Sequence, residues 1–358
     1  MSSQSLPLPL PRPLLRPAAA NWIISGREDL TWFIGPALIS YAVLALMAAG
    51  FPITPLYLIW LLGIDGPHVL ATVTRTYCDP AERQRLGRWL WVVIPAAMLG
   101  PIMVAAGAES FFYIFAISWL HYHIAKQHFG FVMLYKHKAR ERDRTDFLLD
   151  RWFLLSSLML PFGRFAVRNF FAVLPTLPAV QVLDGLLLAA YAALTAAYLI
   201  RQGDKWRKRE LLNAPKLMLL AAVVPLQWLA FGHAAANPAD GLMRAGIVLG
   251  LFHSFQYHRL MWFHNRNRYA HDDANAETGT GLAAGLGAGL AAILARRVVY
   301  YFGAAVLLNL VLAVAPARFM PSPFMKAAVW GIPFTHYILD SKIWRVRGNK
   351  DLAAALHL

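Results

Sequence analysis

The chain has 358 residues, of which 58% are hydrophobic and only 15% are charged. Because about a quarter of the residues of a soluble domain are charged, this composition excludes an ordinary soluble protein and predicts a membrane protein. The net charge of +15 comes from basic residues that punctuate apolar segments, which is typical of topology signals and argues against nucleic-acid binding. A single cysteine, Cys78, excludes an internal disulfide and a cysteine-ligated cluster.

Residues 1–30 are predicted to form a cytoplasmic tail with a short lead-in, because their start (Leu-Pro-Leu-Pro) is too rich in proline for a signal peptide. Residues 31–341 form the predicted transmembrane domain, and residues 342–358 a cytoplasmic C-terminal tail. Within the domain, apolar segments of roughly 20 residues predict an all-α bundle of about ten spans. These segments are 31–51, 55–75, 89–106, 110–135, 151–174, 179–200, 211–232, 241–264, 298–317 and 323–341.

Positive charge predicts the orientation of this bundle. Most of the 34 Lys and Arg residues lie in the two tails or near the loops after the even-numbered spans, which places both termini in the cytoplasm. The chain is therefore expected to be an integral protein of the bacterial inner (plasma) membrane. The Gly/Ala-rich segment 279–294 fits a connector, a re-entrant piece or a surface helix, and the sequence leaves these three alternatives open.

Histidines mark the candidate functional site. Eight of the 12 histidines lie in four of the even-numbered spans, all in the half predicted to be nearer the cytoplasm. Ionisable groups are costly in lipid, so a layer of them predicts a common partner, and a metal centre is the simplest one. The main candidate ligands are His68, His121, His128, His253, His258 and His336, and Asp65, Asp340, His123 and His264 are further candidates. Four other histidines (His137, His233, His271 and His357) are expected to be interfacial.

Helical spacing refines this expectation. His121 and His128 share one face two turns apart, whereas His123 is predicted to point away from both. The pairs Asp65/His68 and His336/Asp340 each bring a carboxylate and an imidazole to one face. Such pairs on facing helices build metal sites in helical bundles, and either aspartate can instead accept a ligand's free N–H. Nitrogen and oxygen donors without thiolate suit iron, manganese, zinc or copper, and we favour one or two iron ions.

Two short segments carry a resemblance to known proteins. Gly63-Ile-Asp-Gly-Pro-His68 is similar to the Pro-His-Gly segment of the Brp/Blh carotenoid-cleaving dioxygenases, and Gln127-His-Phe-Gly130 to the Glu-His-Tyr-Gly box of alkane monooxygenases. The chain thus resembles integral-membrane non-haem iron oxygenases, which include the fatty-acid desaturases and hydroxylases, although the His-x-x-His-His boxes of desaturases are absent. The resemblance implies O2 activation and oxidation of a substrate.

Three function classes follow from these observations. The first is a metal oxygenase that hydroxylates, desaturates or cleaves a lipid-soluble substrate delivered by the membrane lipids. The second is a metal- or proton-coupled transporter that uses the buried ionisable residues as a path. The third is a haem-binding protein with two axial histidines. Because no Gly-x-Gly-x-x-Gly segment opens a helix after a strand, an oxygenase here would receive electrons from a separate donor.

Overall fold

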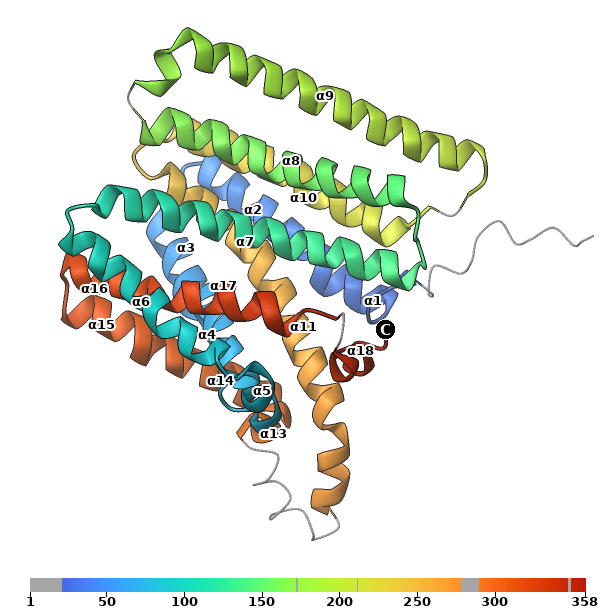
Figure 1. Ribbon diagram of the computed structural model, residues 1–358, viewed down its shortest axis with the longest axis vertical. Helices are drawn as coiled ribbons and strands as arrows, with labels where there is room; N and C mark the ends of the chain where they lie inside the picture. The colour runs from blue at the N-terminus through green and yellow to red at the C-terminus, as the bar shows by residue number, and fades with distance from the viewer. Residues whose placement is uncertain (1–20, 172, 211, 278–289, 347–348) are drawn as a thin grey trace, which may run out of the picture.

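The computed structural model describes residues 21–171, 173–210, 212–277, 290–346 and 349–358 (Figure 1). Within these residues every regular element is helical, which confirms the predicted all-α fold class. The elements are α1 (Gly26–Asp29), η2 (Leu30–Ile34), α2 (Pro36–Ala48), α3 (Ile53–Trp60), η3 (Leu61–Asp65), α4 (Gly66–Arg75), α5 (Pro80–Leu86), α6 (Trp89–Ala105), α7 (Glu109–Lys138), α8 (Arg144–Phe170), η4 (Leu174–Thr176), α9 (Pro178–Arg207), α10 (Ala214–Ala236), α11 (Gly241–Glu277), α13 (Leu290–Ala295), α14 (Val298–Asn309), η5 (Leu310–Val314), α15 (Ala315–Phe319), α16 (Pro323–Val329), α17 (Gly331–Ile343) and α18 (Lys350–Ala355).

Each predicted span overlaps one of these helices or a run of consecutive ones. Five continuous helical stretches of the described residues are long and apolar enough to cross a membrane, and the bent pair of α5 and α6 would make a sixth. The five are Gly26–Ala48, Ile53–Arg75, Pro178–Arg207, Ala214–Ala236 and Val298–Phe319. These helices are those of a membrane protein, whereas the count of ten spans and the orientation stay predictions. The predicted tail 1–20 and most of the Gly/Ala-rich segment lie outside the described residues.

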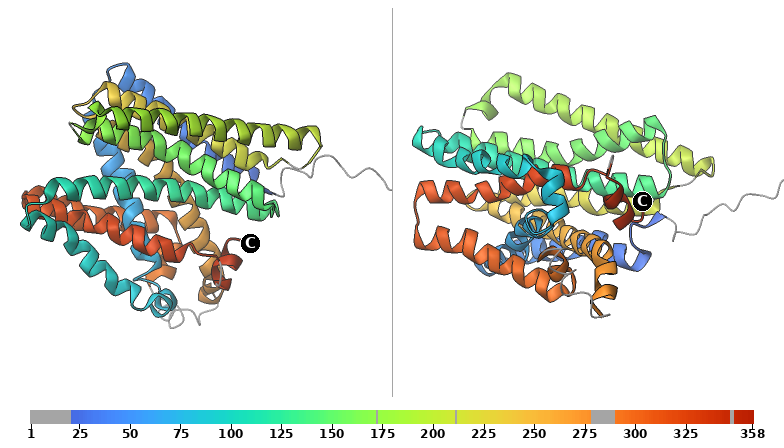
Figure 2. Two further views of the ribbon diagram at one scale, coloured as in Figure 1. Left: turned by 45° about the horizontal axis from the view of Figure 1, so that its top comes forward. Right: turned by 60° about the horizontal axis from the view of Figure 1, so that its bottom comes forward.

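Helices α7, α8, α9 and α10 lie side by side along one side of the bundle (Figures 1 and 2). Helix α9 is the outermost of them, packs on α8 and exposes a row of leucine and isoleucine side chains, including Leu186, Leu199 and Ile200. Lipid tails are as apolar as these side chains, so such a surface is expected where a helix faces the bilayer.

Helix α11 is the longest element and crosses the bundle, packing against α10, α2, α3 and α4 (Figure 1). Gly250 allows its close approach to α3, because a Cβ atom at this position would lie 2.5 Å from the indole nitrogen of Trp60. This approach brings the middle of α11, which carries His253, Tyr257 and His258, against the segment that contains Asp65 and His68.

A turn of π-helix, η3, separates α3 from α4 directly before His68. Two side chains from other helices hold it: Asn309 donates to the Leu61 carbonyl at 3.1 Å, and the His258 Nε2 atom lies 3.0 Å from the Ile64 carbonyl. Gly66 leaves room for Asn309, because a Cβ atom there would lie 2.3 Å from its amide. Single π-turns are frequent at functional sites, and this one fixes the start of the helix that carries His68.

Candidate metal centre

Four histidines from four helices meet in the interior of the bundle: His68 of α4, His123 of α7, His253 of α11 and His336 of α17. Their side chains are between 1% and 9% exposed. The His68 Nε2 atom lies 3.1 Å from the Nε2 atom of His253 and 3.1 Å from that of His336. The His336 Nε2 atom lies 3.2 Å from that of His123. One ring nitrogen of each histidine therefore points at a common centre, with all four atoms within 4.8 Å of one another.

The second ring nitrogen of His68 shows which tautomer of this residue faces the centre. The Nδ1 atom of His68 lies 2.9 Å from the Asp65 carbonyl oxygen, which only accepts hydrogen bonds, so Nδ1 carries the proton. The Nε2 atom of neutral His68 is then an unprotonated acceptor that faces two other nitrogens. A single lone pair accepts one of these neighbours at best, so protons alone do not satisfy the group. A cation at the centre gives the His68 lone pair a partner.

The spacing of these nitrogens fits metal coordination. Histidine nitrogens lie about 2.0–2.1 Å from a bound transition metal, which places neighbouring ligand nitrogens about 3.0–3.4 Å apart. The observed separations of 3.1 and 3.2 Å fall in this range. Four buried histidines this close together can hold a metal ion, and the residues present fit one.

Hydroxyl and carboxylate groups surround the ring nitrogens on one side of the centre. Thr72 Oγ1 lies 2.7 Å from His336 Nδ1 and 2.7 Å from the Tyr257 hydroxyl, which in turn donates to Asp340 Oδ1 at 3.0 Å. Asp340 Oδ2 lies 3.9 Å from His123 Nε2. Asp340, which the sequence suggested as a ligand or as an acceptor from one, thus borders the centre through Thr72, Tyr257 and His123. Partners of this kind fix the orientation of a ligating imidazole.

Asp65 borders the centre from the opposite side of His68. Its carboxylate lies 3.4 Å from His68 Nδ1 and accepts a hydrogen bond from Ser254 Oγ at 2.9 Å. The Nδ1 atom of His68, which faces away from the centre, therefore lies near both the carbonyl and the carboxylate of Asp65. This arrangement suits a residue that orients His68 rather than one that binds the metal. Thr72 and Ser254 were missed in the sequence. Thr72 lies one turn after His68 on the same face, and this spacing is the one signal that would have suggested it.

The expectation for α7 is corrected for two of its three candidates. His123, a further candidate ligand that was predicted to point away from His121 and His128, is the member of α7 that joins the group. His121 instead has its Nε2 atom 2.9 Å from the Leu158 carbonyl and stacks on Phe162 of α8. His128 packs against Phe252, and its Nδ1 atom has no hydrogen-bond partner among the described residues. Helix α7 is buried on two faces. His121 and His128 share one of them, and this face packs on other parts of the bundle, whereas His123 lies on the face that meets the other three histidines.

Two candidates of α11 also lie outside the four-histidine group. His258 contacts the Ile64 carbonyl and the Tyr301 hydroxyl, at 3.0 Å each. It directly follows Tyr257, so its side chain leaves the helix about 100° away from that of Tyr257. His264 lies about three turns beyond His253, where its Nδ1 atom contacts Asn265 and its ring meets Trp344. His258 is part-buried and both of its ring nitrogens have partners, whereas His264 is buried and its Nε2 atom has no hydrogen-bond partner among the described residues.

The histidines expected at the interface have partners elsewhere. His233 lies near Arg244, and His357 contacts Asn267 and Phe263, while His137 is exposed at the end of α7. The side chain of His271 is outside the described residues. None of these three described histidines belongs to the four-histidine group.

Among the protein families, curated proteins and solved structures that were compared with this chain, none matches it.

Proposed function

We propose that this protein is a membrane-embedded oxygenase whose four-histidine centre holds iron and uses O2 to oxidise a lipid-soluble substrate. The reaction class is hydroxylation, desaturation or oxidative cleavage. The observation that carries the proposal is the convergence of four buried Nε2 atoms from α4, α7, α11 and α17. Their meeting at one point favours a binding centre over a transport path, in which ionisable groups would follow one another along the bundle.

Imidazole donors suit iron as well as zinc, copper and nickel, and we propose iron because it activates O2. The four donors are imidazole nitrogens, and the one cysteine, Cys78, is not part of the group, so no thiolate ligand selects copper or a cluster. Iron held by nitrogen and carboxylate donors with open positions supplies O2 activation. Asp65 and Asp340, on two sides of the histidines, balance the charge of a divalent ion in a medium where an isolated charge is costly.

The residues around the centre have distinct tasks in this proposal. The Asp65 carbonyl and Thr72 hold the rings of His68 and His336 with their Nε2 atoms toward the ion. Tyr257 links Thr72 to Asp340 and keeps that carboxylate next to His123. Burial of these groups among apolar helices excludes bulk water from the reaction, and an apolar substrate reaches such a site from the bilayer.

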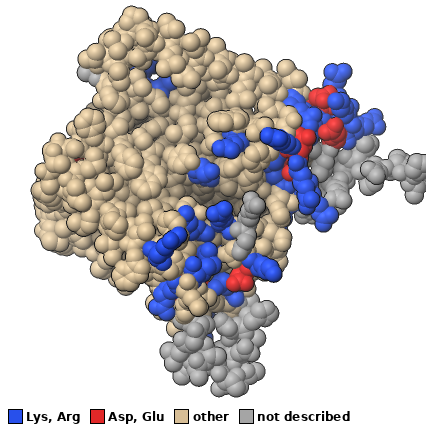
Figure 3. All heavy atoms as spheres, viewed as in Figure 1, with Lys and Arg blue, Asp and Glu red and all other residues tan. Residues whose placement is uncertain are grey.

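Location and partners belong to the same proposal. Figure 3 shows Lys and Arg gathered toward the lower and right-hand side of the face in view, with the left-hand part almost free of them. This one-sided distribution supports a bacterial inner-membrane protein whose charged side is cytoplasmic. Electrons, where the reaction needs them, come from a separate donor protein. The segment 63–68 resembles a segment of membrane iron oxygenases, and this resemblance agrees with the proposal.

Metal analysis of the purified full chain tests the proposal. Wild type is expected to carry about one iron per chain and to show no intense Soret band. His253→Ala combined with His336→Ala should lose the ion, because it removes two of the four nitrogens. His121→Ala combined with His258→Ala is the matched control: it removes one buried and one part-buried histidine outside the group and should keep the ion. Equal metal content in the two double variants would overturn the centre, and a centre that binds zinc alone would overturn the oxygenase.

A further inference from the structure

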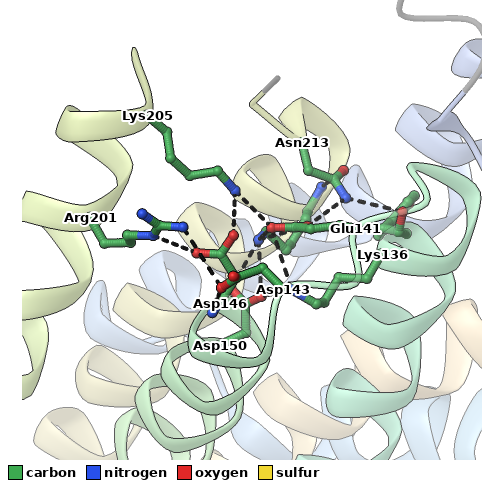
Figure 4. A network of polar contacts seen from close by, with 10 residues as sticks. Lys136, Glu141, Asp143, Asp146, Asp150, Arg201, Lys205 and Asn213 are labelled. Carbon is green, nitrogen blue, oxygen red and sulfur yellow. Dashed lines mark hydrogen bonds and ion pairs between the residues drawn. The ribbon is translucent and has the colours of Figure 1, made fainter. Parts of the chain in front are cut away.

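A charged network closes the end of the bundle where α7 turns into α8 (Figure 4). The Glu141 carboxylate lies within 3.4 Å of the Nζ atoms of Lys136, Lys205 and Lys216, which come from three different helices. Lys136 and Lys216 also pair with Asp150. Burial alone would raise the pKa of Glu141, but the three lysines hold this pKa below its ordinary value. Each of these buried charges therefore has a partner, and the network fixes the position of the turn.

A pocket of about 770 Å³ lies between the α7–α8 turn and the segment after α18, and Lys136 and Glu141 of the network form part of its lining. Its charged lining residues are Lys136, Lys138, Arg140, Glu141, Arg142, Asp143 and Arg144. Five of these side chains are cationic and two are acidic, and Glu141 is already paired with lysines. The pocket therefore has an excess of positive charge.

Three arginines of the pocket are not engaged by the protein. The side chains of Arg140, Arg142 and Arg144 are exposed, and no described residue forms a hydrogen bond or an ion pair with them. This differs from Arg201 nearby, which donates to Asp146 at 2.8 Å. Guanidinium groups present paired donors that match the oxygens of a phosphate, so these three are available for an external anion.

An apolar stripe leads away from the pocket along the outer face of α8. Arg144, Leu148 and Trp152 are spaced four residues apart and share one face of the helix. Leu148 is 41% exposed and Trp152 is 54% exposed, and the guanidinium of Arg151 lies 5.4 Å from the indole ring. A cation at the pocket, an aliphatic side chain and then an exposed tryptophan follow the order of a lipid from headgroup to chain, with the aromatic residue typical of the membrane interface.

We propose that this pocket binds the phosphate group of an anionic membrane lipid, with the lipid's acyl chain lying along Leu148 and Trp152. Unpaired basic residues at the end of membrane helices attract anionic headgroups, which explains the arginines. The exposed stripe favours a lipid over a free phosphate, because a free phosphate would leave Leu148 and Trp152 without a partner. This site is independent of the metal centre.

Native mass spectrometry of the full chain in detergent tests this inference. Three titrations are compared: phosphatidylglycerol, phosphatidylcholine with the same acyl chains, and inorganic phosphate. Wild type should bind phosphatidylglycerol at least tenfold more tightly than phosphatidylcholine. Combined replacement of Arg140, Arg142 and Arg144 by Gln should weaken phosphatidylglycerol binding by about 100-fold, since each cation near a membrane surface contributes about a fivefold factor.

A matched variant replaces Arg83, Arg88 and Arg207 by Gln, because these arginines are also exposed but do not line the pocket. It should bind phosphatidylglycerol as wild type does. The double variant of Arg142 and Arg144 keeps the residue with positive φ, Arg140, and serves if the triple variant fails to fold; it should lose about tenfold or more. Equal losses in the pocket and matched variants, or binding of inorganic phosphate but of neither lipid, would overturn the proposal.

Discussion

The hydroxyl of Thr72 gives the sharpest test of how the histidine centre is supported. Its oxygen is the described partner of His336 Nδ1, at 2.7 Å, and also lies 2.7 Å from the Tyr257 hydroxyl. Thr72→Val removes this oxygen while nearly preserving the volume of a side chain that is 1% exposed. The ring of His336 then loses its anchor, while Tyr257 still donates to Asp340.

The magnitude follows from both effects of this change. Loss of a partner that orients a ligating histidine costs about 10–100-fold in metal affinity. The buried ring nitrogen also loses its hydrogen-bond partner, with Asp340 Oδ1 3.7 Å away, and such a loss costs about 1–3 kcal/mol of stability. We therefore expect Thr72→Val to bind iron 10–100-fold more weakly than wild type, measured by competition with a coloured chelator on the purified full chain.

Thr74→Val is the control for this measurement. Thr74 lies on the same helix, is equally buried and donates to the Ala71 carbonyl at 2.6 Å, away from the four histidines. This variant should keep the metal affinity of wild type. If Thr72→Val holds iron as tightly as Thr74→Val, Thr72 does not support His336 in the loaded protein and the proposed arrangement of ligands is refuted.

Two further predictions concern the rest of the bundle. Glu141→Gln leaves three lysines without their shared carboxylate and should lower the free energy of unfolding by about 3 kcal/mol at pH 7. Because the folded-state pKa of Glu141 is depressed, its contribution is present above about pH 4.5 and is lost as the pH falls through that depressed value. The difference between wild type and variant in thermal unfolding should shrink on acidification, and a constant difference would contradict this. For the topology, reporters fused in the segments of Arg83, Arg142, Lys208 and Arg268 should all report the cytoplasm; any two on the opposite side would refute the ten-span arrangement.

The positions of the helices could be predicted closely from the sequence. Long apolar segments separated by charged loops match helices in all ten predicted ranges, because apolar length and charge punctuation are local properties of the chain. The last range is divided into α16 and α17 at Trp330, and the range 55–75 contains a π-turn before Gly66. Such breaks depend on packing partners, here Asn309 and His258, that a local pattern does not contain.

The site was predicted in part. His68, His253 and His336 were among the main candidates and lie together, because each sits on a span with one polar face. Helix α7 gave the error. It buries His121 and His123 on opposite sides, and the spacing of His121 and His128 shows that they share a face without showing which helices cover it. Face sharing is a property of one helix, whereas a metal centre is a property of several.

The three helices that contribute most of the centre repeat one pattern. Four residues after its histidine, each presents a hydrogen-bonding side chain: Thr72 in α4, Tyr257 in α11 and Asp340 in α17. The histidines contact one another in one layer, and these three side chains contact one another in the next. Contacts in both layers require the three helices to run in the same direction at the site. Helices that run the same way and are distant in sequence need return segments between them, which agrees with the predicted role of the other spans as crossings in the opposite direction.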